Sequence, residues 1–212
     1  DAEVNSLYFL TNDHLIVGVT DYRRTRVGRD QFIFNILRNK KIKLNWGSHA
    51  SSNSFSSGWM RDLFGGFGTI YGVDEKSGKI AMGVLDKYRS VGLYLADLET
   101  GKSSLLERGT KQTTSWMVDK TNNPLIRVDQ DWDNKKTKFF VKRGGWELLL
   151  TIDDVTSYQR SLSDNQKNLN IIKDKFGFSS VLSISLVDGS EEYALFDNMD
   201  RDARRFIRRN AN

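Results

Sequence analysis

Four segments of the chain share one pattern, in which two short apolar runs flank a tight turn. Such a pattern is typical of a β-hairpin, and a glycine in the turn adopts a positive φ without steric cost. The turn glycines Gly101, Gly145 and Gly189 are spaced 44 residues apart. A period of roughly 40–45 residues with four strands per repeat is typical of a propeller blade. The sequence therefore predicts an all-β fold, a partial β-propeller of about four blades of four-stranded antiparallel sheet. The hairpins are 31–44, 92–106, 138–150 and 181–196.

Each hairpin follows shorter strand patterns, so each repeat corresponds to one blade. In the third blade, 113–118 and 124–130 flank the turn 119–123. Pro124 occupies the first position of its strand, where a missing N–H does least harm. In the fourth repeat, the polar segment 155–167 is compatible with a short helix or a meander. We expect residues 1–212 to be a fragment of one propeller domain, with blades at about 4–44, 69–107, 113–152 and 155–197.

The composition is that of a folded globular protein. The chain is 38% hydrophobic and 28% charged, which separates it from disordered sequences. No apolar run approaches the roughly 20 residues of a membrane span. The absence of cysteine excludes disulfides and thiolate metal sites. Residue 1 is Asp rather than Met, and no signal-peptide pattern follows it, so we expect a piece cut from a longer chain.

The net charge of +5 is not gathered in one stripe, because basic residues are spread over three of the four hairpins. A nucleic-acid interface would need a basic stripe with aromatic platforms. One dense run stands at the chain end, where a solvated terminal helix or a frayed end is favoured over a nucleic-acid site. Its members are Arg201, Arg204, Arg205, Arg208 and Arg209.

Neither histidine lies in a catalytic pattern. His14 opens a strand after a turn, and we expect a surface or rim position for it. His49 lies beside Ser48 in the insertion 45–68, but no Gly-x-Ser-x-Gly elbow accompanies it. Gly65-Gly66-Phe67-Gly68 lacks the Lys-Ser/Thr of a phosphate loop. We therefore predict no catalytic and no cofactor-binding residue, and we expect the insertion to be mobile or to pack on a loop face.

Asp129, Asp131 and Asp133 alternate in a way that is similar to calcium loops. The segment lacks the glycine and the distal glutamate of such a loop. We therefore favour a solvated turn and predict no metal site and no cofactor.

Two tryptophans in the third blade have opposite expected environments. Trp116 lies in an inner strand beside Met117 and Val118. We take this strand to be central and therefore expect Trp116 to be buried between blades. Trp146 follows a turn, so we expect it to be partly exposed. A structural role is favoured over ligand stacking for both.

The order and spacing of these motifs resemble the N-terminal propeller of the prolyl oligopeptidase family of serine peptidases, over most of residues 4–202. The likeness is closest to bacterial dipeptidyl-peptidase and acylaminoacyl-peptidase members. It is carried by the stretches 92–102, 116–119 leading to Pro124, 145–148, and 185–189 followed by 195–197.

The resemblance implies a role in access rather than chemistry. Family members carry an α/β-hydrolase domain after the propeller, and this sequence ends before any such domain, so no catalytic residue transfers to it. The implied partners are a downstream hydrolase domain of the same polypeptide and a peptide substrate, in a bacterial periplasm or cytoplasm. No membrane is expected, and nucleic acid is disfavoured. Self-association through open propeller edges stays open, as does a stand-alone propeller that binds a protein or ligand.

Overall fold

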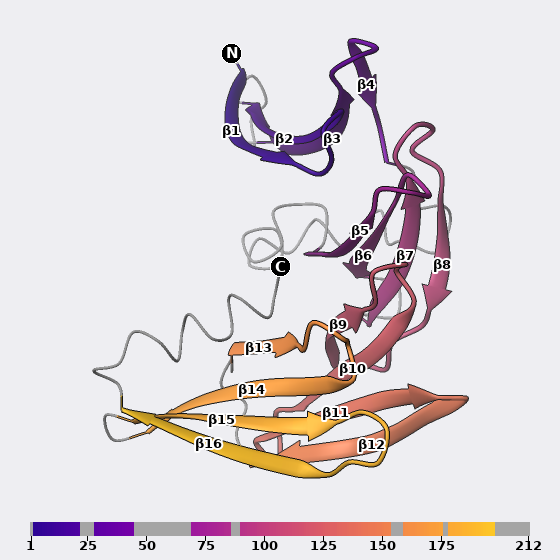
Figure 1. The fold of residues 1–212 in the computed structure, drawn as a ribbon. Helices are drawn as coiled ribbons and strands as arrows, with labels where there is room; N and C mark the ends of the chain where they lie inside the picture. Colours follow the sequence, from indigo (N-terminus) through magenta and orange to yellow (C-terminus); the bar gives the residue numbers. More distant parts are fainter. Residues whose placement is uncertain are drawn as a thin grey trace. The chain divides into compact units, whose positions relative to one another are not determined.

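The computed structural model describes residues 2–21, 28–44, 69–85, 90–153, 159–175 and 178–197. These residues form sixteen β-strands and no helix (Figure 1). The insertion 45–68, with His49, and the arginine-rich end lie outside the described residues. The predictions made for them therefore stay predictions.

The strands form four sheets, each of four consecutive strands that pair in chain order. Sheets 1 to 4 are defined here in that order. Sheet 1 contains β1 (Ala2–Phe9), β2 (His14–Asp21), β3 (Gly28–Asn35) and β4 (Lys40–Ile42). Sheet 2 contains β5 (Thr69–Asp74), β6 (Lys79–Leu85), β7 (Val91–Asp97) and β8 (Ser103–Glu107). The predicted fold class, an all-β partial propeller, is confirmed.

The second half of the chain repeats this order. Sheet 3 contains β9 (Thr113–Val118), β10 (Pro124–Asp131), β11 (Lys136–Arg143) and β12 (Gly145–Ile152). Sheet 4 contains β13 (Gln159–Leu162), β14 (Asn168–Lys175), β15 (Phe178–Ser185) and β16 (Glu191–Asp197). The segment left open as helix or meander thus holds a strand, β13.

The chain forms two compact units, Asp1–Asp129 and Gln130–Asn212. In the first unit, one core joins sheets 1 and 2. It is built mainly from alternating β-branched and long apolar side chains, among them Ile16, Ile33, Ile42, Ile80 and Met82. In the second unit, fully buried side chains come from sheets 3 and 4, namely Phe139, Leu169, Ile171 and Ile184.

Residues with positive φ repeat along the chain with the blade period. Gly78, Asn122 and Gln166 each lie in the turn between the first two strands of a sheet, and 44 residues separate successive members. In the hairpin turns between the last two strands the positive φ falls at Gly101, Gly144 and Gly189. The repeat predicted through Gly145 is therefore carried by Gly144, since Gly145 already begins β12.

The two tryptophans have the expected environments, but the burial of Trp116 has a different cause from the one expected. Trp116 is buried, with 2% of its surface exposed, while Trp146 is partly exposed with the Lys142 ammonium 4.9 Å from its ring centre. β9, which carries Trp116, is an end strand of sheet 3 rather than a central one. Its burial comes from sheet 2, whose Val91 carbonyl oxygen accepts the indole N–H at 2.9 Å.

Candidate functional site

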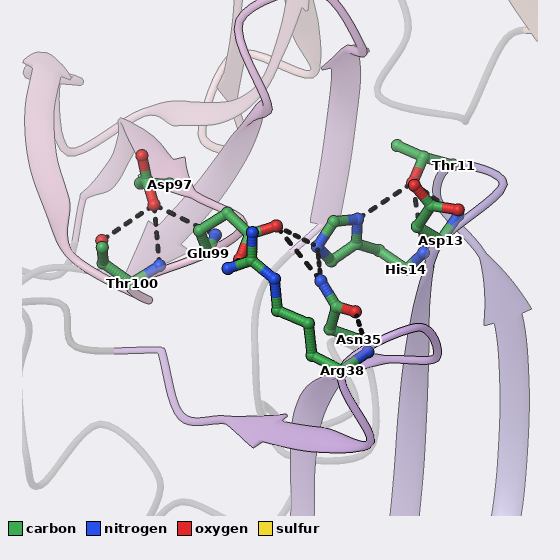
Figure 2. A network of polar contacts seen from close by, with 8 residues as sticks. All are labelled: Thr11, Asp13, His14, Asn35, Arg38, Asp97, Glu99 and Thr100. Atoms are coloured by element: carbon green, nitrogen blue, oxygen red, sulfur yellow. Dashed lines mark hydrogen bonds and ion pairs between the residues drawn. The ribbon is translucent and has the colours of Figure 1, made fainter.

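A network of polar side chains joins the turn ends of sheets 1 and 2 (Figure 2). Sheet 1 contributes Thr11 and His14 from the β1–β2 turn and the start of β2, and Asn35 from the end of β3. Arg38 lies in the β3–β4 turn. Sheet 2 contributes Glu99 from the β7–β8 turn. Five positions spread over 89 residues of sequence are thus brought together by the pairing of β2 with β3 and by the packing of the two sheets.

Asn35 is the centre of this network. Its Oδ1 accepts the backbone N–H of Arg38 at 2.9 Å, which fixes the orientation of the amide. Its Nδ2 then donates to Glu99 Oε1 at 3.1 Å and lies 3.0 Å from Nε2 of His14. Arg38 Nη1 donates to the other oxygen of Glu99, Oε2, at 2.6 Å. Glu99 is therefore held from sheet 1 by an amide and a guanidinium.

The turn that carries Glu99 is fixed by Asp97. Its Oδ1 accepts the backbone N–H groups of Glu99 and Thr100 at 3.0 and 2.7 Å, and the Thr100 hydroxyl at 2.8 Å. Burial is the largest influence on the pKa of Asp97 and raises it. The hydrogen bonds from Thr100 and Glu99 outweigh burial and hold the pKa below its usual value. The ionised carboxylate therefore keeps this turn in one conformation.

Gly101 completes the same turn with a φ of 70°. A Cβ atom at this position would collide with the Lys43 carbonyl oxygen and approach Ile42 Cγ2 at 3.1 Å. Only glycine allows both the backbone conformation and the close approach of the turn to the end of sheet 1.

A hydroxyl, an imidazole and a carboxylate in line suggest a hydrolytic triad, but the imidazole is buried and its Nε2 faces the amide of Asn35 as well as the carboxylate. Nδ1 of His14 lies 3.0 Å from Thr11 Oγ1, and Nε2 lies 3.0 Å from Asn35 Nδ2. A nucleophilic hydroxyl must be open to a substrate and give its proton to a base. Thr11 Oγ1 also accepts the backbone N–H groups of Asp13 and His14. The network is a structural junction between two sheets.

The surface or rim position expected for His14 is wrong, since only 7% of the residue is exposed. Its carboxylate neighbour, Glu99 Oε1 at 3.4 Å from Nε2, comes from 85 residues further along the chain. No local motif could have indicated this pair, because the packing of sheets 1 and 2 creates it.

A second polar cluster lies inside β9 and β10. Thr113 Oγ1 donates to Asp129 Oδ1 at 2.7 Å, and Arg127 Nε donates to the same oxygen at 3.1 Å. Arg127 and Asp129 are both buried, so the carboxylate is neutralised and hydrogen-bonded, as a buried charge requires.

The solvated turn expected for the aspartates 129, 131 and 133 is therefore wrong for two of them. Asp129 and Asp131 belong to β10 and are buried, and only Asp133 lies exposed in the turn. Asp131 accepts the backbone N–H of Asn134 at 3.2 Å and lies 3.6 Å from Lys138 Nζ. Asp129 and Asp131 alternate because every second residue of a strand faces the same side, and not because they line a loop. Within the described part of the chain, no group of His, Cys, Asp or Glu side chains could hold a metal ion.

Sheet 1 also carries a large apolar surface on the side away from the core. In its first strand Val4, Leu7 and Phe9 are exposed by 63%, 52% and 70%. The sequence patterns did not indicate this surface, because alternation along a strand does not show whether another element covers each side. Among the described residues, no helix has the length and apolarity to cross a membrane.

Four sheets, each built from four consecutive strands and the last three repeating every 44 residues, define the chain as a protein of the β-propeller class. No protein-family model matches the sequence, and a search of curated proteins found no match. Solved structures do match. The β-propeller domain of the trilobed protease from Pyrococcus furiosus aligns over 92% of this chain and 58% of its own, with a TM-score of 0.54 and 15% identity.

Two acylaminoacyl peptidases match similarly. The enzyme from Pyrococcus horikoshii covers 93% of this chain with a TM-score of 0.56 and 13% identity. A complex with Z-Gly-Gly-Phe-chloromethyl ketone covers 92% with a TM-score of 0.55 and 14% identity. This chain spans only 33% of the length of each enzyme. The fold is thus similar to the propeller domains of these peptidases, as the sequence motifs indicated.

Proposed function

We propose that the chain is the non-catalytic propeller portion of a serine peptidase of the prolyl oligopeptidase family, which gates the access of peptides to a downstream α/β-hydrolase domain. The observation that carries the proposal is the alignment of more than nine-tenths of the chain with propellers of a protease and of acylaminoacyl peptidases. The sequence motifs support the same family independently.

Gating by a propeller depends on size selection. In this fold the blades surround a central channel, and a channel lined by strands admits an extended peptide but excludes a folded protein. The described residues support a role without chemistry, because their imidazole, His14, is buried in a polar network that joins two sheets. Substrate cleavage would then belong entirely to the hydrolase domain.

The test compares three proteins. Short peptides and a folded protein serve as substrates for each of them. The first protein is the 212-residue chain, the second is the polypeptide extended through the sequence encoded after Asn212, and the third is the extension alone. We expect no hydrolysis by the 212-residue chain, cleavage restricted to short peptides by the extended polypeptide, and loss of that restriction in the extension alone.

Two results would contradict the proposal. One is serine-inhibitor-sensitive hydrolysis by the purified 212-residue chain. The other is an extension without a hydrolase domain, which would leave the stand-alone binding module as the better interpretation.

A further inference from the structure

The β3–β4 turn of sheet 1 carries the most exposed large apolar side chain among the described residues. Leu37 is 76% exposed, and Ile36 beside it is 40% exposed. In the corresponding turn of sheet 2, Leu98 follows β7 directly and is buried. The turn of sheet 1 therefore presents two apolar residues to the outside, where they contribute little to the core.

The same hairpin carries a dense group of basic residues. They occupy four of six consecutive positions and are Arg38, Lys40, Lys41 and Lys43. No Asp or Glu occurs between Asp30 and Asp62 in the sequence. Arg38 pairs with Glu99 Oε2 at 2.6 Å (Figure 2). The three lysines are exposed, and no carboxylate of the described residues forms an ion pair with them. Residues 36–43 are called the basic hairpin below.

Hydrogen bonds hold the basic hairpin in one conformation. The backbone N–H of Ile36 donates to the Asp13 carbonyl oxygen at 2.8 Å, and that of Arg38 donates to Asn35 Oδ1 at 2.9 Å. Asn39 has a φ of 48°, a left-handed conformation that asparagine tolerates. The exposed apolar residues are therefore preorganised, so that a partner which binds them loses little free energy in ordering the turn.

The position of the basic hairpin keeps it outside the contacts between blades. Propeller blades bury the apolar faces of their sheets against one another. A further blade beside sheet 1 would therefore cover a face of that sheet and not the turn beyond the ends of β3 and β4. Sheet 2 already contacts this turn through Glu99, and Leu37 remains exposed beside that contact.

We propose that the basic hairpin is a contact site for an anionic lipid surface. Leu37 and Ile36 enter the boundary between headgroups and acyl chains, which reaches about 5–10 Å below the surface in such contacts. The lysines bind headgroup phosphates, because their flexible stems keep the ammonium groups at the polar level. This inference goes beyond the proposed function and does not depend on it. The expectation that no membrane takes part rested on the lack of a spanning segment, which a peripheral contact does not need.

The shape and chemistry of the basic hairpin favour lipid over a macromolecular partner. A turn of four residues is convex and much smaller than the roughly 800 Å² that each protein buries in a standard interface. A single-stranded nucleic acid stacks its bases on aromatic side chains, and Ile36 and Leu37 offer none. A fluid lipid surface adapts to a convex apolar tip, and its negative charge complements the lysines.

Cosedimentation with vesicles tests the proposal on the 212-residue chain. One set of vesicles is phosphatidylcholine, and the other contains an equal share of phosphatidylglycerol. We expect binding to the anionic vesicles that weakens with added salt, and at least about tenfold weaker binding to the neutral ones. Leu37→Ser should weaken the binding at least about tenfold, as should the double substitution Lys40→Gln and Lys43→Gln. These positions are exposed, so the variants should stay folded, as circular dichroism checks.

The chain offers a matched control for each variant. Val187→Ser changes a turn residue of sheet 4 that is 71% exposed but stands beside Asp188 instead of lysines. The double substitution Lys76→Gln and Lys111→Gln removes the same charge from exposed turn positions elsewhere. Both controls should bind anionic vesicles like the unmodified chain. The arginine-rich chain end is present in every variant, so its effect cancels in the comparison.

A second measurement locates the contact directly. The chain has no cysteine, so an environment-sensitive dye can be attached at a single introduced one. Its emission should shift to shorter wavelength on anionic vesicles in Leu37→Cys and should not shift in Val187→Cys. The proposal is overturned if the chain does not bind anionic vesicles, or if the hairpin variants and their controls lose binding equally. It is also overturned if single-stranded DNA binds as tightly and Leu37→Ser leaves both interactions unchanged, because the lysines would then form a general polyanion surface.

Discussion

Trp116 is buried by a neighbouring sheet rather than by its own. Its strand is the end strand of sheet 3, yet only 2% of the residue is exposed and its indole N–H reaches the Val91 carbonyl oxygen in sheet 2. A large side chain in this position contributes apolar burial and a directed hydrogen bond between sheets. Trp146 is instead partly exposed, and the Lys142 ammonium lies 4.9 Å from its ring centre.

Trp116→Ala is therefore expected to lower the free energy of unfolding by about 3–5 kcal/mol, the range for truncating a buried aromatic residue. Trp146→Ala should lower the free energy of unfolding much less, by about 1 kcal/mol, because a partly exposed side chain has less buried apolar surface to lose. Urea denaturation of both variants measures the difference. Similar losses would show that Trp116 does not depend on sheet 2.

Asn122 shows a second way in which one residue connects two sheets. It has a φ of 65°, and its Nδ2 donates to the Lys79 carbonyl oxygen of β6 at 3.0 Å. Gly72 faces it, and a Cβ there would approach Asn122 Oδ1 to 2.5 Å. The left-handed turn, the amide and the glycine therefore form one fitted contact between the β9–β10 turn and sheet 2.

At the scale of the element, the hairpin turns differ in what surrounds them. Gly101 and Gly144 both have φ values that favour glycine, 70° and 79°. A Cβ at Gly144 would meet no atom within 4 Å, whereas at Gly101 it would collide with the Lys43 carbonyl oxygen. The two positions thus separate the backbone cost of an L-residue from the steric cost of contact with another sheet.

Gly144→Ala is expected to destabilise the chain by about 1 kcal/mol, the cost of a left-handed conformation alone. Gly101→Ala should destabilise it by at least about twice as much, because the backbone of sheet 1 must move as well. Chemical denaturation of the pair provides the comparison. Equal effects would mean that the turn of sheet 2 does not lie against the end of sheet 1.

The turns also explain a predicted dependence on pH. Five aspartates in or beside the turns accept several hydrogen bonds, which lower the pKa of each carboxyl group. They are Asp74, Asp97, Asp119, Asp131 and Asp188. Hydrogen bonding from the Ser185 side chain, and then from Ser190, lowers the pKa of Asp188 from 3.8 to about 2. In that interval the unfolded chain binds more protons than the folded one, so stability decreases with falling pH.

The contribution of Asp188 to the free energy of unfolding should thus be fully present above pH 3.8 and should decline as the pH falls toward about 2. Asp188→Asn removes one titrating group and should make the decline less steep than in the unmodified chain. Thermal unfolding followed across this interval measures both slopes. An unchanged slope in Asp188→Asn would contradict the role given to its hydrogen bonds.

At the scale of the whole molecule, local features of the sequence were sufficient for the repeat but not for the contacts between sheets. The hairpin around Gly101 and the turn before Pro124 could be predicted because apolar alternation and turn residues are local signals. β13 was left open because its four residues, Gln159–Leu162, are mostly polar. The burial of His14 could not be predicted, since it depends on Glu99 in another sheet.

Each sheet consists of four strands that follow one another in the chain, and no described sheet borrows a strand from another. Pairing therefore requires closure of short loops only, within a stretch close to one period of the repeat, and such local contacts form rapidly. During synthesis, one sheet can complete its hydrogen bonds while the next is still being translated. Over evolutionary time, duplication or loss of one such stretch changes the number of sheets and leaves the remaining ones intact, as in other proteins built from stacked units.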